Sequence, residues 1–220
     1  MKSTALTGLL TAAVLIPLTA GAQPRPGNPT TSTVITKAEI DKIAATMKDV
    51  TTRDENARVV DIGDGWSMEL GIIHRASTRN PPPAPAPAAA RGNAPAPQVI
   101  PCGQTMATPP ADAIPGAITH DLQTEGYYIV SGAGTAFIDG HVVNGRKSTA
   151  NPDGGPNGPG CGGLAVGSRK IELKVGDVLI VPPGVIHGWF DIPDHVDYLS
   201  FRPSHGIMKN GWVNPTIATK

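Results

Sequence analysis

The second half of the chain is built from short apolar runs that are separated by turns containing Gly or Asp-Gly. Runs of this length, bounded by turn residues, are typical of β-strands. They cover residues 117–122, 125–131, 134–138, 171–174, 177–182, 185–191 and 197–203. Because many short strands with no helical pattern between them favour a sandwich or a barrel, we predict an all-β fold.

One helix is predicted before these strands. Thr36 and Glu39 have the spacing of a capping box, which marks a helix start. Apolar residues then follow at helical spacing, namely Ile40, Ile43, Ala44, Met47 and Val50. The pattern predicts an amphipathic helix over residues 37–50, whose apolar side covers the outside of a sheet.

From Arg58 onward the apolar period changes to two, as in a strand. One side of this strand carries the row Trp66, Met68, Leu70, Ile72 and His74. The other side carries Ser67, Glu69, Gly71 and Arg75. We expect the first row to face the core, which would turn the ring of His74 toward the interior.

The N-terminal 22 residues have the layout of a secretory signal peptide. Lys2 supplies a positive charge, residues 5–18 are apolar, and Ala20-Gly21-Ala22 forms a small-residue cleavage site. We therefore predict an exported protein, periplasmic or secreted, with no membrane anchor after cleavage. Residues 23–35 are predicted to form a flexible leader, 36–205 one domain, and 206–220 a C-terminal tail. Within the domain, 79–115 is a Pro-rich insertion and 144–168 a Gly-rich loop.

The charge balance argues against nucleic acid as a partner, because 18 Lys and Arg residues match 18 Asp and Glu residues without any basic block. The cysteine count is equally informative. In an exported protein, an even number of cysteines favours a disulfide, here between Cys102 and Cys161. A pair of metal-binding thiols is the alternative, although neither cysteine belongs to a C-x-x-C motif.

Two segments carry the chemistry. The first runs from Ile118 through His120 and Glu125 to Gly132, and the second from Gly176 through Pro182 and Gly184 to His187. Together they resemble the two motifs of the cupin family, G-x5-H-x-H-x3-4-E-x6-G and G-x5-P-x-G-x2-H-x3-N. Ile118 stands where the first motif has its leading histidine, and Asp191 stands where the second motif has asparagine.

The resemblance covers about residues 58–203 and implies a jelly-roll-like β-barrel that holds a divalent metal ion on His120, Glu125 and His187. It also implies a homodimer. The residue types themselves agree with a metal site, since two imidazoles and one carboxylate form a facial triad with open positions. Iron, manganese, zinc, nickel and copper all suit such a centre.

Two further residues are candidates for catalysis. Tyr127 has the same facing as Glu125 and could donate a proton or orient an anionic ligand. His74 could replace the ligand missing at Ile118 or act as a general acid or base, the alternative being a rim histidine bonded to a loop. These residues favour a metal-dependent enzyme for a small polar molecule, of the dioxygenase, lyase or isomerase type. A non-enzymatic cupin that binds a metal or a small ligand is the alternative, since the leading histidine is absent.

Overall fold

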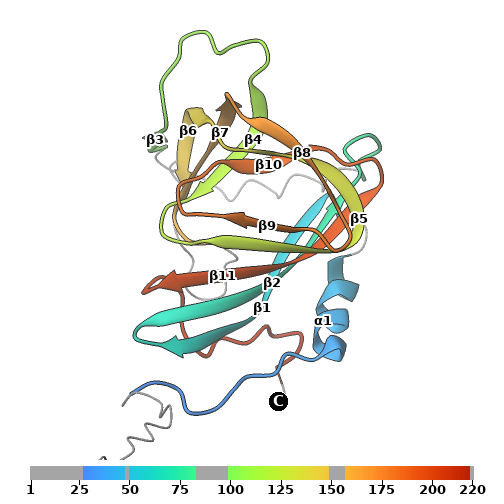
Figure 1. Ribbon diagram of the computed structural model, residues 1–220, viewed down its shortest axis with the longest axis vertical. Coiled ribbons are helices and arrows are strands. Elements are labelled where there is room, and N and C mark those ends of the chain that lie inside the picture. Colours follow the sequence, from blue (N-terminus) through green and yellow to red (C-terminus); the bar gives the residue numbers. More distant parts are fainter. Residues whose placement is uncertain (1–26, 48–49, 83–98, 149–156, 219–220) are drawn as a thin grey trace, which may run out of the picture.

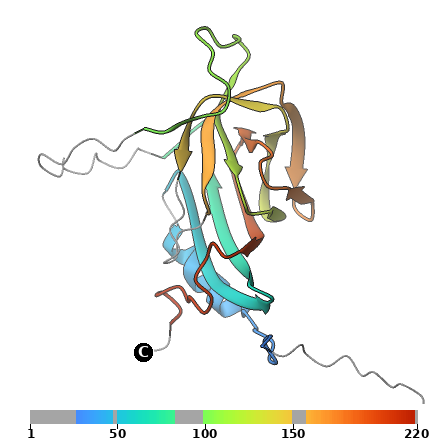
Figure 2. The same ribbon diagram turned by 90° about the vertical axis from the view of Figure 1, so that its left-hand side faces the viewer.

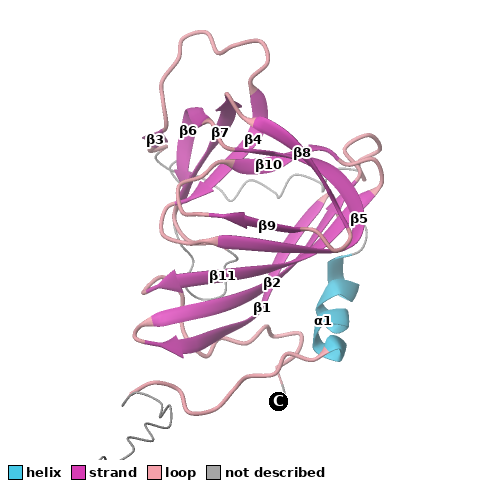
Figure 3. Ribbon diagram, in the orientation of Figure 1, coloured by secondary structure: helices cyan, strands magenta, loops and turns pink. Residues whose placement is uncertain are grey.

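The computed structural model describes residues 27–47, 50–82, 99–148 and 157–218, and in these the chain is mostly antiparallel β-sheet with one short helix (Figures 1 and 3). The all-β prediction is therefore confirmed. The strands are β1 (Thr52–Gly63), β2 (Trp66–Ala76), β3 (Pro101–Cys102), β4 (Ile114–His120), β5 (Glu125–Ile138), β6 (His141–Ser148), β7 (Gly160–Val166), β8 (Arg169–Lys174), β9 (Val178–Val181), β10 (His187–Asp191) and β11 (His195–His205).

The strands form two sheets that share β5. One sheet has the order β1-β2-β11-β5-β9, and the other continues from β5 through β10, β4, β7 and β6 to β3, with β8 on the other side of β5. Sequence reasoning predicted two strands over 125–131 and 134–138, but the structure has one long strand. Gly132 lies at the transition with a φ of 68°, a conformation that favours glycine, so the strand changes sheets there.

Helix α1 (Lys37–Ala44) is followed by a 3-10 turn, η1 (Ala45–Met47), so the regular helix is shorter than the predicted span of 37–50. The predicted capping box is confirmed, because Thr36 and Glu39 exchange side-chain and backbone hydrogen bonds. The helix packs on β2 and β1, as Figure 1 shows. Ile43, Met47, Ala57, Leu70, Ile72 and Ile217 form the shared apolar cluster.

The facing predicted for β2 is wrong. Leu70 and Ile72 pack against the helix on the outside of the sheet, whereas Ser67 and Glu69, from the supposedly solvent-facing row, are fully buried between the sheets. Both faces of β2 are therefore covered. The apolar row was expected to face the interior because the opposite face of an antiparallel sheet is usually exposed to water. Here the outer face is covered by helix α1 instead of water.

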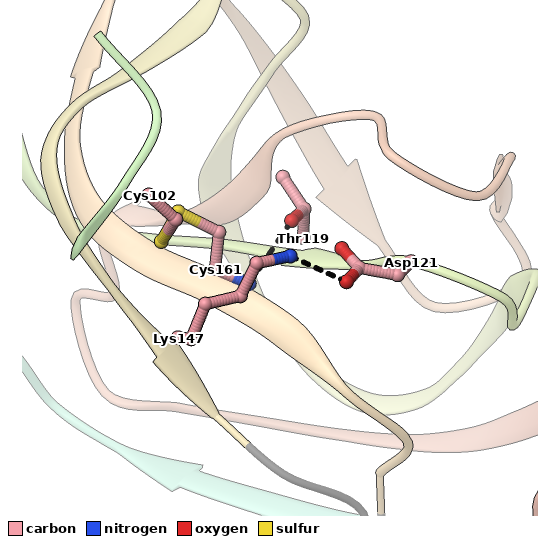
Figure 4. Close-up of a disulfide and its surroundings, with 5 residues drawn as sticks. All are labelled: Cys102, Thr119, Asp121, Lys147 and Cys161. Carbon is pink, nitrogen blue, oxygen red and sulfur yellow. Dashed lines mark hydrogen bonds and ion pairs between the residues drawn. A yellow bond between two sulfur atoms is a disulfide. The ribbon is translucent and has the colours of Figure 1, made fainter. Parts of the chain in front are cut away.

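The two regions expected to be loops contain strands. β6 and β7 extend into residues 144–168, while β3 and the start of β4 lie in the second half of 79–115. Residues 83–98 and 149–156 are outside the described part, as are the predicted signal peptide and the first residues of the leader. The predicted disulfide is confirmed: Cys102 on β3 joins Cys161 on β7, with 6.0 Å between their Cα atoms (Figure 4).

The segment after β11 returns to the first sheet and covers the free edge of β1. The amide of Val59 donates to the carbonyl of Trp212 at 2.9 Å, and the amide of Asn214 donates to Ala57 at the same distance. Figure 2 shows this C-terminal segment running beside the cyan strands β1 and β2. Within the described ranges, no helix has both the length and the apolar character needed to span a membrane.

Candidate metal centre

The three predicted ligands come together between the two sheets. His120 ends β4, Glu125 begins β5 after a short turn, and His187 begins β10, which lies between β4 and β5. Their exposed fractions are 5%, 3% and 1%, so all three are withdrawn from solvent. One ligand atom from each residue lies within 4.8 Å of the other two, and these residues form the one such group among the described residues.

One oxygen of Glu125 lies between the two imidazoles. Its Oε2 atom is 3.1 Å from Nε2 of His120 and 2.9 Å from Nε2 of His187. The centroids of the two rings are 5.0 Å apart. Three ligand atoms therefore converge from three strands, in an arrangement that a single ion could bridge.

The hydrogen bonds of His187 indicate which of its nitrogens is available. Its Nδ1 atom is 3.2 Å from the carbonyl oxygen of Val185, which can only accept, so Nδ1 carries the hydrogen. In the neutral ring, Nε2 then has a lone pair directed at the group, and this buried atom has no hydrogen-bond partner. A lone pair 2.9 Å from a carboxylate oxygen is repulsive unless a proton or a metal cation lies between them.

The donor set fits a transition-metal ion. Imidazole nitrogens suit zinc, copper, iron and nickel, whereas magnesium and calcium prefer oxygen ligands throughout. In known metal sites, hydrogen bonds from surrounding residues usually orient the ligands. Here the hydrogen bond of Nδ1 orients His187, and hydrogen bonds to the second carboxylate oxygen orient Glu125.

The carboxylate of Glu125 is ionised despite its burial. Burial alone would raise its pKa, but the charge of Arg202, followed by the close contacts with the imidazoles of His120 and His187, holds the pKa well below its usual range. The second oxygen, Oε1, accepts from Ser200 Oγ at 3.1 Å and from Nε and Nη2 of Arg202 at 3.0 and 2.8 Å. Glu125 is thus a charged ligand with one oxygen committed to protein donors.

Tyr127 lies beside the group, as its facing in the sequence predicted. Its hydroxyl donates to Oε2 of Glu125 at 3.3 Å, and its ring is edge-on to His187 at 6.2 Å. Burial, followed by the charge of Glu125, raises the pKa of Tyr127 well above its usual value, so the hydroxyl stays protonated. It can serve as a hydrogen-bond donor next to the centre.

Trp189 belongs to the wall of the interior. It packs on the apolar cluster that contains Tyr127 and Tyr198, and its indole donates to the hydroxyl of Tyr198 at 3.4 Å.

Ile118 occupies the position where a fourth ligand would be. It pairs directly with His187 across β4 and β10, so both side chains leave the sheet on the same face. A histidine at this position would be next to the group, which agrees with the motif alignment. The apolar side chain of Ile118 leaves a three-residue ligand set.

The structure corrects the expectation for His74. Its ring shares the outer face of the sheet with Ile72 and Leu199, and it lines a cleft of about 450 Å³ beside α1. Its Nδ1 atom is 2.6 Å from a carboxylate oxygen of Asp197. Its ring stacks on the ring of His195, with 6.5 Å between the two centroids. His74 is therefore separated from the metal centre by the sheet and does not replace the ligand missing at Ile118.

Other polar residues of the motif segments also lie outside the centre. Asp121 pairs with Lys147 at 2.6 Å near the disulfide (Figure 4). Asp191, where the motif has asparagine, pairs with Arg79. His141 is exposed at the hairpin after Asp139.

Sequence reasoning missed three residues that support the centre. Asp54, Ser200 and Arg202 lie between the sheets, and Arg202 is fully buried with ion pairs to Asp54 and Glu125. The signal was present in β11, where Ser200 and Arg202 alternate with Leu199 and Phe201. That alternation was compatible with either facing, and polar residues are usually placed outside.

Comparison of the chain with protein-family models and with curated proteins finds no match in either set. The fold and the geometry of the group are accordingly what support a functional conclusion.

Proposed function

We propose that the chain is a metal-binding cupin that holds one divalent transition-metal ion on His120, Glu125 and His187. Three features support this proposal: the order and spacing of the two motif segments, the two antiparallel sheets that enclose the residues, and the nitrogen-nitrogen-oxygen donor set. The single observation that carries it is the close approach of two acceptors, Nε2 of His187 and Oε2 of Glu125, at 2.9 Å.

The metal content of the purified full-length protein tests this proposal. We expect about one ion per chain, as a single site with three protein ligands requires. His187→Ala should bring the content down to that of the metal-free buffer, because it removes one ligand and leaves an open site. The matched control is His141→Ala, which removes an exposed histidine and should leave the content unchanged. Equal metal content in the two variants would contradict the proposal.

We infer that the centre acts on a small polar molecule. A bound divalent ion supplies a Lewis acid that polarises a carbonyl or phosphoryl oxygen. Within the chain, Tyr127 would turn its single O–H from Oε2 of Glu125 to the oxygen of a ligand bound beside it, while Trp189 and Tyr198 pack the adjoining wall. Chemistry of the dioxygenase, lyase or isomerase type is compatible with these groups.

The burial of the ligands favours a second candidate, a binding protein without catalysis. With exposed fractions of 5% or less, the three ligands admit only small partners in this conformation. An oxygen-uptake and lyase screen on small acids and phenols separates the candidates. Turnover that falls in Tyr127→Phe while the metal content stays constant supports an enzyme, and a silent screen supports the binding role.

We also propose that the protein is exported and that it forms a homodimer. The disulfide supports an oxidising compartment, since such bonds persist mainly in exported proteins. A homodimer is supported by the apolar edge strand β9, where Val178 and Ile180 are largely exposed. Light scattering of the purified protein, compared with the chain mass of 22.7 kDa, tests the dimer.

A further inference from the structure

Arg202 makes an unusually complete set of contacts for a fully buried side chain. An arginine has five N–H donors, and each is used here. Nε and one Nη2 hydrogen reach Oε1 of Glu125, the other Nη2 hydrogen and one Nη1 hydrogen reach the two oxygens of Asp54, and the last reaches Oδ1 of Asn56. The distances lie between 2.6 and 3.3 Å. The guanidinium is thus held from both sides.

The same contacts determine which oxygen of Glu125 is available to an ion. Oε1 accepts three hydrogen bonds, two from Arg202 and one from Ser200 Oγ, whereas Oε2 is directed toward the two imidazoles. A carboxylate can bind an ion through one oxygen or both, but an oxygen whose lone pairs are already used is not free to do so.

We propose that Arg202 is a positioning residue that makes Glu125 a one-oxygen metal ligand. This inference rests on the proposed metal-binding function and adds how the third ligand is oriented. With only Oε2 engaged, the ligand set occupies three positions on the ion and leaves the others to an external ligand.

Asp54 makes this arrangement compatible with a cation. A lone buried guanidinium near the centre would repel a divalent ion, since charges in a protein interior are weakly screened. Asp54 binds Arg202 through both oxygens at 3.0 and 2.6 Å and balances its charge. Arg202 can then hold Glu125 through directed hydrogen bonds without adding net positive charge beside the ion.

A purely structural role is the competing explanation. It is a weak one, because well-packed apolar residues often stabilise a protein interior as well as a buried ion pair does. The two explanations differ in one respect. A structural role affects the stability of the metal-free protein, whereas a positioning role also changes the affinity and the coordination of the bound ion in protein that has folded.

The decisive variant is the charge-balanced pair Asp54→Asn/Arg202→Gln, which removes one positive and one negative charge together. Co2+ titration of the folded, full-length protein is the measurement, because the visible spectrum of Co2+ reports its coordination. We expect binding to weaken about 10- to 100-fold, the usual effect of losing an outer-shell partner, with an altered spectrum. The matched control is Asp139→Asn/Arg169→Gln, a surface ion pair at a hairpin, which should behave as the wild type.

Arg202→Lys provides a second variant if the double variant fails to fold. It keeps the charge that Asp54 requires but donates from a single nitrogen, so it cannot hold Oε1 as the guanidinium does. An intermediate loss of Co2+ affinity is expected. Wild-type affinity and spectrum in either folded variant would overturn the positioning role and leave the metal site intact. A wild-type protein that binds no Co2+ would overturn the proposed function itself.

Discussion

The two faces of the sheet that contains β2 and β11 bury opposite kinds of chemistry. The inner face carries Glu69, Ser200 and Arg202, each at 0% exposure, whereas the outer face carries Leu70 and Ile72 under helix α1. Both faces are well covered, but the ion pair between Arg202 and Glu125 on the inner face is fully buried, whereas the ion pairs on the outer face are partly exposed. Alternation alone therefore separates two sets of residues without indicating which set lies inside.

The difference reflects what each face has to bind. The outer face contacts a helix and needs only complementary apolar surface. The inner face surrounds the charged carboxylate of Glu125, and buried charges are tolerated when they are paired and hydrogen-bonded. Glu125, Arg202 and Asp54 form such a chain from the centre to β1. Substitutions on each face, followed by measurements of stability and of Co2+ affinity, show whether the two faces are independent.

The largest effect is expected from Arg202→Met on the inner face. It leaves the buried Glu125 and the partly buried Asp54 without their cation, and breaking a buried pair costs about 3 to 5 kcal/mol. Urea denaturation of the metal-free protein measures the free energy of unfolding. Arg169→Met, which removes an exposed partner of Asp139, is the control and should cost at most about 1 kcal/mol. Similar losses in the two variants would show that the inner charges are not specially stabilised.

On the outer face, Ile43→Ala should lower the free energy of unfolding by about 2 to 5 kcal/mol, because this fully buried side chain fills the contact between α1 and β2. Its affinity for Co2+ should equal that of the wild type, since the helix and the centre lie on opposite faces. Val34→Ala, at a position that is 72% exposed, is the control for stability. A weakened metal site in Ile43→Ala would break the proposed independence of the faces.

The inner face should also give stability a distinct pH dependence through Glu69. Burial raises the pKa of Glu69 from 4.5 to about 7, although the charge of Arg202 and hydrogen bonds from Asn56 and Gln123 oppose this rise. Because the pKa is raised on folding, the folded state binds this proton more tightly than the unfolded state does. The associated stability is present below pH 4.5 and is lost as the pH rises through about 7.

The shift corresponds to on the order of 3 kcal/mol. Between pH 5 and pH 8, the free energy of unfolding of the metal-free wild type should fall by most of this amount. The free energy of unfolding of Glu69→Gln should not show this fall, because glutamine does not titrate. Unfolding free energies at several pH values provide the measurement. Parallel pH profiles for the two proteins would show that Glu69 does not titrate as the inner face predicts.

The smallest effect is expected from Ile118→His, which restores the leading histidine of the motif. Because residue 118 pairs with His187, the new imidazole should reach the ion and tighten Co2+ binding about tenfold, equivalent to about 1.4 kcal/mol. Ile114→His is the control, since Ile114 packs in a different cluster on the same strand. Unchanged affinity in Ile118→His would mean that the three-ligand set tolerates no addition there.

Much of the centre was predictable because its residues are local in sequence. His120 and Glu125 are separated by one short turn, and His187 follows a Pro-x-Gly turn, so the two motif segments already predict a shared interior. The prediction for His74 was wrong because an apolar row was assumed to face the interior. In the structure this row is apolar because helix α1 covers it on the outer face. Arg202 was missed because its partners, Asp54 and Glu125, are 148 and 77 residues away in the chain.

The amino-acid sequence by itself determined most of the strands, the capped helix, the two cysteines that pair, and the three residues of the candidate metal centre. These features depend on local periodicity, turn residues and spacing, which one segment carries without reference to another. Only the tertiary structure decided which face of β2 and β11 lies inside, that β5 is one strand shared by two sheets, and that Arg202 holds Glu125. Such features depend on which segments meet across the molecule, and the burial of a charge becomes favourable only when its distant partners are in place.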